Sequence, residues 1–421
     1  MDKFSPDFLL GAATAAHQVE GSNDNSDCWA MEQMEHTSFI EPSLDAVDHY
    51  HRYQEDIRLM ADAGLNAYRF SVEWARIEPE EGHFDDAQAE HYLDVIHCCK
   101  EHGLEPIVTL HHFSSPKWLI GKGGWEAEST VDDFARYVRY IIGKLGNELH
   151  YVCTINEANM GIQVAAIAKR YTLQMQAQAA KAQSADGTVQ VGINLEKMMA
   201  DQKATAEENI KVFGVEKVEN FTSMRTREGD LLIMKAHALA RKEIKVGLTL
   251  SLHDIQSTAG GEKHAKKEWD DEFTHYLPYI QNDDFLGVQN YTRSLMGPEG
   301  TLPTPDGAEL TQMNYEFYPE ALEHVIRKVA KDFKGDLIVT ENGIATGDDK
   351  KRIAFIETAL TGVQNCLRDN LPVRGYFHWS LIDNFEWQKG YSMTFGLIAV
   401  DRTTQTRHPK ESLSYLGSYR G

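Results

Sequence analysis

Basic residues are under-represented in this sequence of 421 residues. It contains 42 Lys and Arg against 64 Asp and Glu, which gives a formal net charge of −22 at pH 7. Nucleic acids and anionic membrane surfaces attract basic patches, so this charge balance argues against both as partners. No apolar run approaches the ~20 residues needed to cross a bilayer. With 42% hydrophobic and 25% charged residues, the composition is typical of a soluble globular protein.

Cysteine is also scarce, and its pattern indicates neither disulfides nor a metal site. The five cysteines are odd in number and lack the spacing of metal ligands. Reduced cysteines fit the cytoplasm, which is the location that we expect. No cluster of His, Asp and Glu has ligand spacing either, so we expect no metal. The five are Cys28, Cys98, Cys99, Cys153 and Cys366.

The chain lacks a Pro-, Gly- or Ser-rich linker, so we expect residues 1–421 to form one domain. The apolar residues 8–16 resemble the core of a signal peptide. However, only Lys3 supplies positive charge before them. We interpret this stretch as a buried strand.

Strand-like and helical segments alternate through most of the sequence. Helices are predicted near residues 53–64, 87–102 and 130–146. Eight strand–helix units in one chain predict a single (β/α)8 barrel, the TIM-barrel fold of the α/β class. The strand candidates are residues 8–15, 66–72, 106–112, 151–157, 245–250, 285–291, 337–341 and 375–380.

Residues 160–235 break this alternation, because they are too long for one strand-to-strand connection. They follow the fourth strand, so we expect an atypical insertion above the open end of the barrel. Its methionines suit a lid that grips apolar groups, but extra helices packed on the barrel rim are an equal alternative. Residues 188–195 also compete with 245–250 as the fifth strand.

Two glutamates stand at the ends of short apolar strands. Glu157 ends the strand at 151–157, and Glu341 ends the strand at 337–341. In a barrel of parallel strands, all carboxyl ends open onto the same face, where catalytic groups gather. A pair of carboxylates is the minimum equipment for cleaving a glycosidic bond. A single Glu in such a place would more often cap a strand or pair with a surface cation.

Further motifs accompany both glutamates in a fixed order. The chain reads Thr-Ile-Asn-Glu at 154–157 and Thr-Glu-Asn-Gly at 340–343, with other characteristic stretches at residues 8–21, 68–77, 109–113, 379–387, 390–391 and 395–401. Together they resemble glycoside hydrolase family 1, the β-glucosidase family. The resemblance runs from end to end and weakens around residues 160–235.

The resemblance implies a role for each residue around the two glutamates. Glu157 would be the general acid/base and Glu341 the nucleophile of a retaining mechanism. Asn156 would bind the 2-hydroxyl of the sugar, where hydrogen bonds strengthen in the transition state. Arg69 and Tyr291 would hold the nucleophile, and a cation with a phenol donor favours its ionised form.

The resemblance also implies a set of sugar-binding residues. Amide, imidazole and carboxylate groups suit sugar hydroxyls, and indole rings suit the apolar face of a sugar. Taken singly, each has a structural alternative, such as a core position for the Trp or an interior position for the His. The set is Gln18, His112, Trp379, Glu386, Trp387 and Phe395.

Three departures from the family pattern affect the leaving-group side. Ala158 stands where the family usually has Pro, and Phe113 stands where it usually has Trp. Gln289 replaces an Asn near the sixth strand. These changes leave the preference for the aglycone, the non-sugar or second-sugar partner, undetermined.

We therefore expect a cytoplasmic, retaining exo-β-glycosidase that acts on a small β-glycoside or short oligosaccharide without a cofactor. The most favoured activity is that of a β-glucosidase, with β-galactosidase or β-fucosidase activity beside it. One alternative is a 6-phospho-β-glycosidase, which carries Ser where this chain has Glu386, and a carboxylate would repel a phosphate dianion. Another is an inactive sugar-binding protein, although such relatives lose a catalytic Glu. The sequence leaves a homo-oligomer open.

Overall fold

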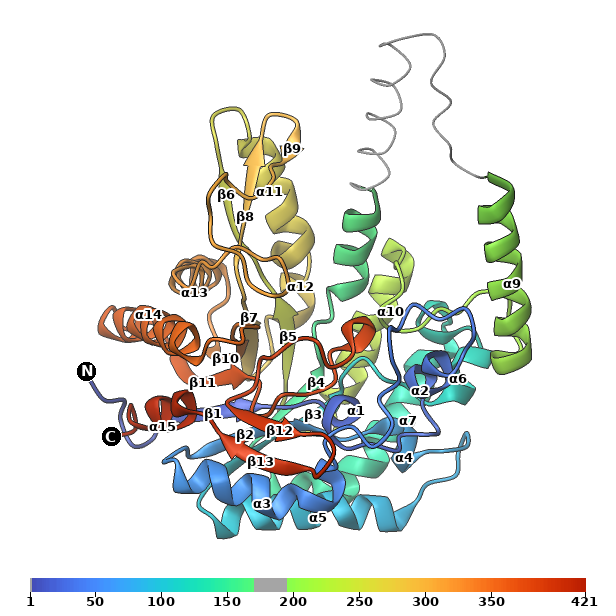
Figure 1. Cartoon of the computed structure of the whole chain (residues 1–421), viewed down its shortest axis with the longest axis horizontal. Coiled ribbons are helices and arrows are strands. Elements are labelled where there is room, and N and C mark those ends of the chain that lie inside the picture. Colours follow the sequence, from blue (N-terminus) through green and yellow to red (C-terminus); the bar gives the residue numbers. More distant parts are fainter. Residues whose placement is uncertain (1, 170–194) are drawn as a thin grey trace.

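The computed structural model describes residues 2–169 and 195–421. Within them, eight parallel strands close into a barrel in the order β1-β11-β10-β7-β5-β4-β3-β2 (Figure 1), which confirms the predicted fold. The strands are β1 (Leu9–Ala13), β2 (Ala67–Ser71), β3 (Glu105–His111), β4 (Tyr151–Ile155), β5 (Gly247–Ser251), β7 (Phe285–Gln289), β10 (Asp336–Asn342) and β11 (Val373–Trp379).

The N-terminal apolar stretch forms β1, as predicted. This strand pairs with β11 over five residues and with β2 over three, so it closes the barrel. The strand at 247–251 takes the fifth position, since it pairs with both β4 and β7. Of the competing stretch 188–195, residues 188–194 lie outside the described residues, and Leu195 begins a helix.

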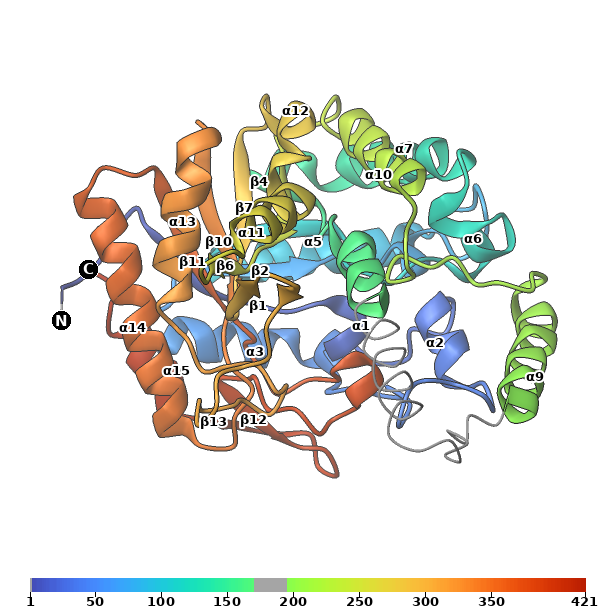
Figure 2. The same ribbon diagram turned by 90° about the horizontal axis from the view of Figure 1, so that it is seen from above.

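Helices surround the barrel, as the view from above shows (Figure 2). The three helices expected from the sequence are α3 (His49–Asp62), α5 (Asp86–Glu101) and α7 (Ser129–Leu145). The other longer helices are α9 (Leu195–Phe213), α10 (Arg227–Ala240), α11 (Glu262–Trp269), α13 (Ala321–Asp332) and α14 (Asp349–Arg368). Short helices are α1 (Ala16–Val19), α2 (Asp27–Glu32), α4 (Trp74–Ile77), α6 (Lys117–Gly121), α12 (Leu277–Ile280) and α15 (Glu411–Gly417).

Local chemistry sets the limits of these helices, as α5 illustrates. The Asp85 side chain accepts hydrogen bonds from the backbone N–H of Ala87 and Gln88 and so caps the first turn. Past the other end, Gly103 has a φ of 73°, a conformation that glycine adopts without strain. Between the ends, Tyr92 and Ile96 recur at helical spacing and are buried in the core.

Two small sheets lie outside the barrel. A long extension is built from β6 (Asp254–Ser257), β8 (Arg293–Gly297) and β9 (Gly300–Thr301), and it projects at the top of Figure 1. A hairpin pairs β12 (Ile398–Asp401) with β13 (Thr406–Pro409). The two chain ends lie close together in both views, and the backbone N–H of Phe4 donates to the carbonyl of Tyr419 at 2.9 Å.

The segment after β4 begins with a helix over residues 160–169. Further along, Phe213 at the end of α9 packs with Ala30, Met34 and Ile120, and the short loop after it leads to α10. Helix α10 packs beside α7 and begins inside the stretch 160–235 that the sequence marked as atypical. A lid function for that stretch stays a prediction. In the part of the chain that the structure describes, no helix has the length and apolar character of a membrane span.

Closure of the barrel depends on the absence of a side chain at Gly11. A Cβ atom there would overlap the carbonyl oxygen of Ala67 and come within 2.8 Å of the Phe377 ring. We expect Gly11→Ala to lower the free energy of unfolding by about 1–3 kcal/mol, as overpacking does. In contrast, a methyl group added at Gly143 in α7 would have no neighbouring atom within 4 Å, so Gly143→Ala should raise stability by about 0.4–1 kcal/mol. Thermal unfolding of both variants checks this, and equal midpoints would contradict it.

Candidate active site

The two predicted glutamates both lie where the barrel strands have their carboxyl ends. Glu341 lies within β10, and Glu157 follows β4 by two residues. The backbone N–H of Glu157 donates to the Thr249 hydroxyl of β5 at 2.9 Å. Both glutamates are nearly buried and line one cavity of about 560 Å³. This volume is in the range of small-molecule sites.

Glu341 is held by the two residues that the sequence assigned to it. Arg69 donates from Nη1 to Oε1 of Glu341 at 2.6 Å, and the Tyr291 hydroxyl donates to Oε2 at 2.6 Å. The second guanidinium nitrogen of Arg69 donates to Oδ1 of Asn156, also at 2.6 Å. Both carboxylate oxygens of Glu341 therefore have a strong donor, which fixes the orientation of the group.

Burial and neighbouring charges shift the pKa values of the two carboxyl groups to different extents. Burial raises the pKa of Glu341, but the Arg69 charge and the hydrogen bond from Tyr291 oppose this rise. Burial also raises the pKa of Glu157, and the negative charge of Glu341 adds to the rise, so that it lies well above the usual value. The net shift is upward for both groups, and these causes favour the protonated form of Glu157 more than that of Glu341.

Asn156 sits at the centre of the polar groups below the cavity. Its Oδ1 accepts from Arg69 and, at 2.7 Å, from Nε2 of Gln289. Its Nδ2 lies 3.1 Å from Nε2 of His112. These contacts fix the amide with its oxygen toward the cation. Gln289 was noted in the sequence only as a departure from the family pattern, and its contact with Asn156 could not be inferred from that.

The six predicted sugar-binding residues all line the same cavity. His112 stacks on Trp379 with ring centroids 5.6 Å apart. Gln18 donates to Glu386 at 3.2 Å and to the carbonyl of Phe385 at 2.7 Å. Burial raises the pKa of Glu386 to about 8, and the charge of Glu341 adds to the effect. The structure thus gathers the whole predicted set, although their roles stay predictions.

Two polar atoms at this end of the cavity have no protein partner. Within the described residues, Oε1 of Gln18 and Nδ1 of His112 are buried and unpaired. Buried polar atoms are rarely left in this state unless a ligand or water completes them. The neighbouring His111 points away from the cavity, with its Nε2 3.0 Å from the Ser115 hydroxyl.

Three residues that line the cavity have a left-handed backbone, which is unfavourable for side chains other than glycine. The φ angles are 43° at Glu157, 68° at Phe113 and 45° at Trp387. Such conformations persist only where the surrounding structure enforces them, and they concentrate at functional sites. In this cavity they aim one carboxyl and two aromatic rings at the same space.

Comparison with known proteins agrees with this geometry. The sequence model of Glycosyl hydrolase family 1 matches residues 1–209 and 262–419. The chain belongs to this family. A β-glucosidase of Agrobacterium sp. is 29% identical over 97% of this chain and 94% of its own. A 6-phospho-β-galactosidase of Lacticaseibacillus casei is also 29% identical, over 98% and 97%. The crystal structure of β-glycosidase BGL167 is 44% identical, with a TM-score of 0.87 over 99% of this chain and 96% of that one.

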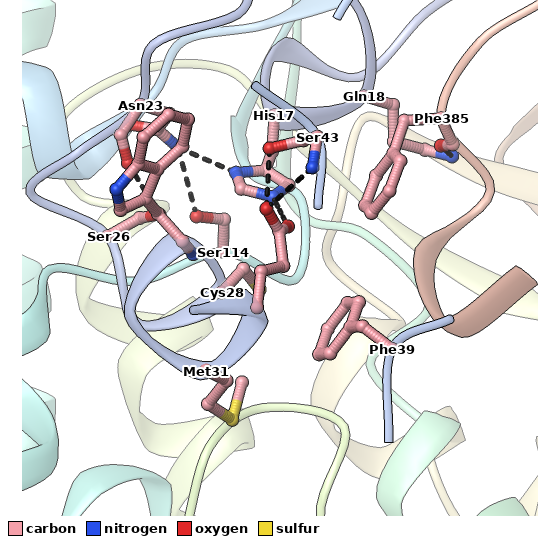
Figure 3. A network of polar contacts seen from close by, with 12 residues as sticks. His17, Gln18, Asn23, Ser26, Cys28, Met31, Phe39, Ser43, Ser114 and Phe385 are labelled. Atoms are coloured by element: carbon pink, nitrogen blue, oxygen red, sulfur yellow. Dashed lines mark hydrogen bonds and ion pairs between the residues drawn. The ribbon is translucent and has the colours of Figure 1, made fainter. Parts of the chain in front are cut away.

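A buried polar network beside the cavity includes His17, from the motif at residues 8–21, and Glu32. Nε2 of His17 lies 2.6 Å from Oε1 of Glu32, and the other carboxylate oxygen accepts from the Ser43 hydroxyl at 2.6 Å and its N–H at 2.8 Å. Asn23 lies 2.9 Å from Nδ1 of His17. Figure 3 shows His17 between Ser43 and Asn23 in this network. Burial lowers the pKa of His17, but the hydrogen bond and charge of Glu32 outweigh it, so the net shift is upward.

This network fixes the loop that carries Glu386 and Trp387. The His17 ring stacks on Trp387 with centroids 5.6 Å apart and planes 7° from parallel. The Tyr391 hydroxyl, beyond Trp387 in the same loop, donates to the carbonyl of Ser43 at 2.5 Å. Glu32 thus bonds to His17, which stacks on Trp387, and to Ser43. The carbonyl of Ser43 in turn accepts the hydrogen bond from Tyr391 in the loop that carries Trp387. The sequence analysis gave no role to either residue, although His17 lies beside Gln18 in the stretch 8–21, because the contact of His17 with Glu32 depends on the fold.

No cluster of three or more His, Cys, Asp or Glu side chains with the geometry of a metal site occurs in residues 2–169 and 195–421. The polar groups of the cavity are instead arranged as hydrogen-bond donors and acceptors around two carboxyl groups. Such a cavity suits a neutral, hydroxyl-bearing ligand.

Removing the charge of Glu32 tests whether the network positions Trp387. In Glu32→Gln, His17 loses its anionic partner, and the surface behind Trp387 becomes less rigid. We expect KM for a β-glucoside to rise about tenfold, equivalent to about 1.4 kcal/mol, with a smaller change in kcat. Steady-state kinetics with a nitrophenyl glucoside measure this.

The buried pair of His49 and Asp56 offers a matched control. These side chains lie 2.8 Å apart and do not line the cavity. Asp56→Asn should lower the melting temperature, as breaking a buried ion pair does, and leave KM unchanged. If both variants change KM equally, the positioning role of Glu32 is wrong.

Proposed function

We propose that this protein is a retaining exo-β-glycosidase, with β-glucosidase activity as the main one. The observation that carries the proposal is the pairing of Glu341, held by Arg69 and Tyr291 at 2.6 Å each, with Glu157 in the same cavity, where burial and the charge of Glu341 raise the pKa of Glu157. A carboxylate with fixed orientation and a carboxylic acid are the two groups that the retaining reaction needs.

The reaction takes place in two displacements. Glu341 attacks the anomeric carbon, the bond to the leaving oxygen breaks, and that oxygen takes the proton of Glu157. Glu157, now ionised, then removes a proton from water, and the water oxygen displaces Glu341 from the same carbon. Both carboxyl groups end in their starting states, and the configuration of the sugar is retained.

The surrounding residues provide the affinity for the sugar. Asn156 is oriented by Arg69 and Gln289, so its amide is available to the 2-hydroxyl as positive charge develops on the ring. Gln18 and Glu386 present an amide and a carboxyl to the hydroxyls farther along. Gln18 and Trp379 are buried, which supports an exo-acting enzyme that takes a terminal residue into a closed end of the cavity.

The same hydroxyl-binding pair leaves room for related sugars. An amide and a carboxyl accept either orientation of a sugar hydroxyl, so β-galactosidase and β-fucosidase activities are part of the proposal. Measuring kcat/KM with the nitrophenyl glycosides of glucose, galactose and fucose ranks these activities.

The 6-phospho-β-glycosidase alternative is less well supported, although one such relative is as similar as the β-glucosidases. Glu386 already carries a pKa raised to about 8, because burial and Glu341 disfavour its charge. Among the described residues, no ion pair provides it with a cation. A phosphate dianion beside this carboxyl would disfavour its ionised form further. An inactive sugar-binding protein is disfavoured because both glutamates are present with their supporting contacts.

We also propose a cytoplasmic location. All five cysteines are buried free thiols. This state is typical of proteins from a reducing compartment.

Replacing the proposed nucleophile tests the mechanism directly. Glu341→Gly should reduce kcat by about 10⁴-fold or more, because no group remains to form the covalent intermediate. Azide enters the vacated space and attacks the same carbon, so activity toward an activated glucoside should return with an α-glucosyl azide as product. Substantial hydrolysis by Glu341→Gly without azide would overturn the assignment.

The pH profile tests the role of Glu157. A group with a raised pKa stays protonated to higher pH, so kcat/KM should fall on the alkaline side where Glu157 loses its proton, and on the acid side where Glu341 gains one. Glu157→Gln should lower kcat/KM for alkyl glucosides by about 10²–10⁴-fold. With a dinitrophenyl glucoside, whose leaving group needs no proton, the loss should be small and the alkaline fall absent. If kcat/KM of Glu157→Gln with the dinitrophenyl glucoside still falls at alkaline pH, the group that causes the fall is Glu386 and not Glu157.

A further inference from the structure

We propose that the outer part of the cavity binds an extended apolar aglycone, an alkyl chain or a carbon ring system, in preference to a second sugar. The proposal rests on the proposed function and deepens it, because the glycosidase assignment by itself leaves the leaving group undetermined. It is carried by the side chains that line the cavity next to Glu157.

The position of Glu157 identifies the leaving-group side. A general acid donates to the departing oxygen, so the aglycone lies next to it. From Glu157 the chain continues into the helix at 160–169, and Met160, Val164 and Ile167 all line the cavity. Their spacing of four and three residues places them on one face of that helix. Apart from Gln163, the side chains that this helix presents to the cavity are thus apolar over two turns.

Other segments extend this apolar lining. Phe113 follows β3 and packs on Phe221 and Trp387, with ring centroids 5.8 and 5.3 Å away. Met31, near the end of α2, and Phe39 beyond it line the cavity as well. Figure 3 shows Met31 and Phe39 together below the polar network. Methionine side chains adapt their shape to varied apolar partners, which suits an aglycone site.

Three polar side chains of this outer part already bond to protein atoms. Gln163 donates to the carbonyl of Ser251 at 2.9 Å, and Thr222 donates to Asn220 at 3.3 Å. Nδ2 of Asn220 in turn contacts the sulfur of Met31 at 3.6 Å. Each of these donors already has a protein partner, which leaves fewer hydrogen bonds for the hydroxyl groups of a second sugar.

The sugar end of the cavity differs in this respect. There, Oε1 of Gln18 and Nδ1 of His112 are buried without a partner among the described residues. A sugar in the outer part would lose hydrogen bonds to water and regain few, which is unfavourable. An apolar group there would leave water and contact apolar side chains, which is favourable in proportion to its area.

Three glucosides that differ in the leaving group test this inference. Methyl and octyl β-D-glucoside release alcohols of similar reactivity, so the ratio of their kcat/KM values reports contact with the chain. Cellobiose releases a second glucose. For the wild-type protein we expect octyl glucoside to exceed methyl glucoside by at least about tenfold, and cellobiose to stay below octyl glucoside.

A matched pair of variants locates the effect. Ile167 lines the cavity and is 58% exposed, so Ile167→Gln should fold normally and lower the octyl-to-methyl ratio by at least about fivefold. Ile210 in α9 is 47% exposed and does not line the cavity, so Ile210→Gln should leave the ratio unchanged.

The outcomes separate the inference from the proposed function. An octyl-to-methyl ratio below about tenfold, cellobiose as the better substrate, or an equal ratio in Ile167→Gln and wild type would overturn the apolar aglycone site while leaving the glycosidase intact. Failure to hydrolyse all three and a nitrophenyl glucoside would overturn the proposed function itself.

Discussion

The buried guanidinium of Arg69 is the interaction on which the site depends. A charge removed from water is strongly unfavourable unless it is paired and hydrogen-bonded. Arg69 meets this requirement with Glu341 on one side and Asn156 on the other, so β2, β10 and the end of β4 are joined at one point. Its positive charge favours the ionised form of Glu341, whose negative charge in turn favours the protonated form of Glu157. Burial, the charge of Glu341 and the position of Arg69 together give the two glutamates different pKa values.

The cavity around this centre has two chemically distinct ends. At the sugar end, polar groups such as Gln18 and His112 retain unpaired atoms, and the stacked rings of His17 and Trp387 support them from behind. At the outer end, the helix after Glu157 contributes Val164 and Ile167, and the polar groups beside them bond to protein. The boundary between the two ends lies at Glu157, where a glycosidic bond would be cleaved.

Much of this architecture could be predicted because its signals are local. Runs such as residues 337–341 are apolar and β-branched, and the alternation of such runs with amphipathic helices is typical of only a few folds. The order of the motifs then assigned the family. The helix at 160–169 could not be read in the same way, since Met160, Val164 and Ile167 suit a core face as well as a cavity wall.

By itself, the sequence determined the eight-stranded barrel, the two glutamates at its open end and the residues expected to bind the sugar. These depend on periodicity and short motifs, which act between near neighbours in the chain. Only the tertiary structure decided that Arg69 also holds Asn156, that His17 and Glu32 support Trp387, and that one helical face lines the cavity beside Glu157. Arg69 and Asn156 are 87 residues apart. Contacts over such separations depend on the path of the whole backbone, and no local pattern encodes that path.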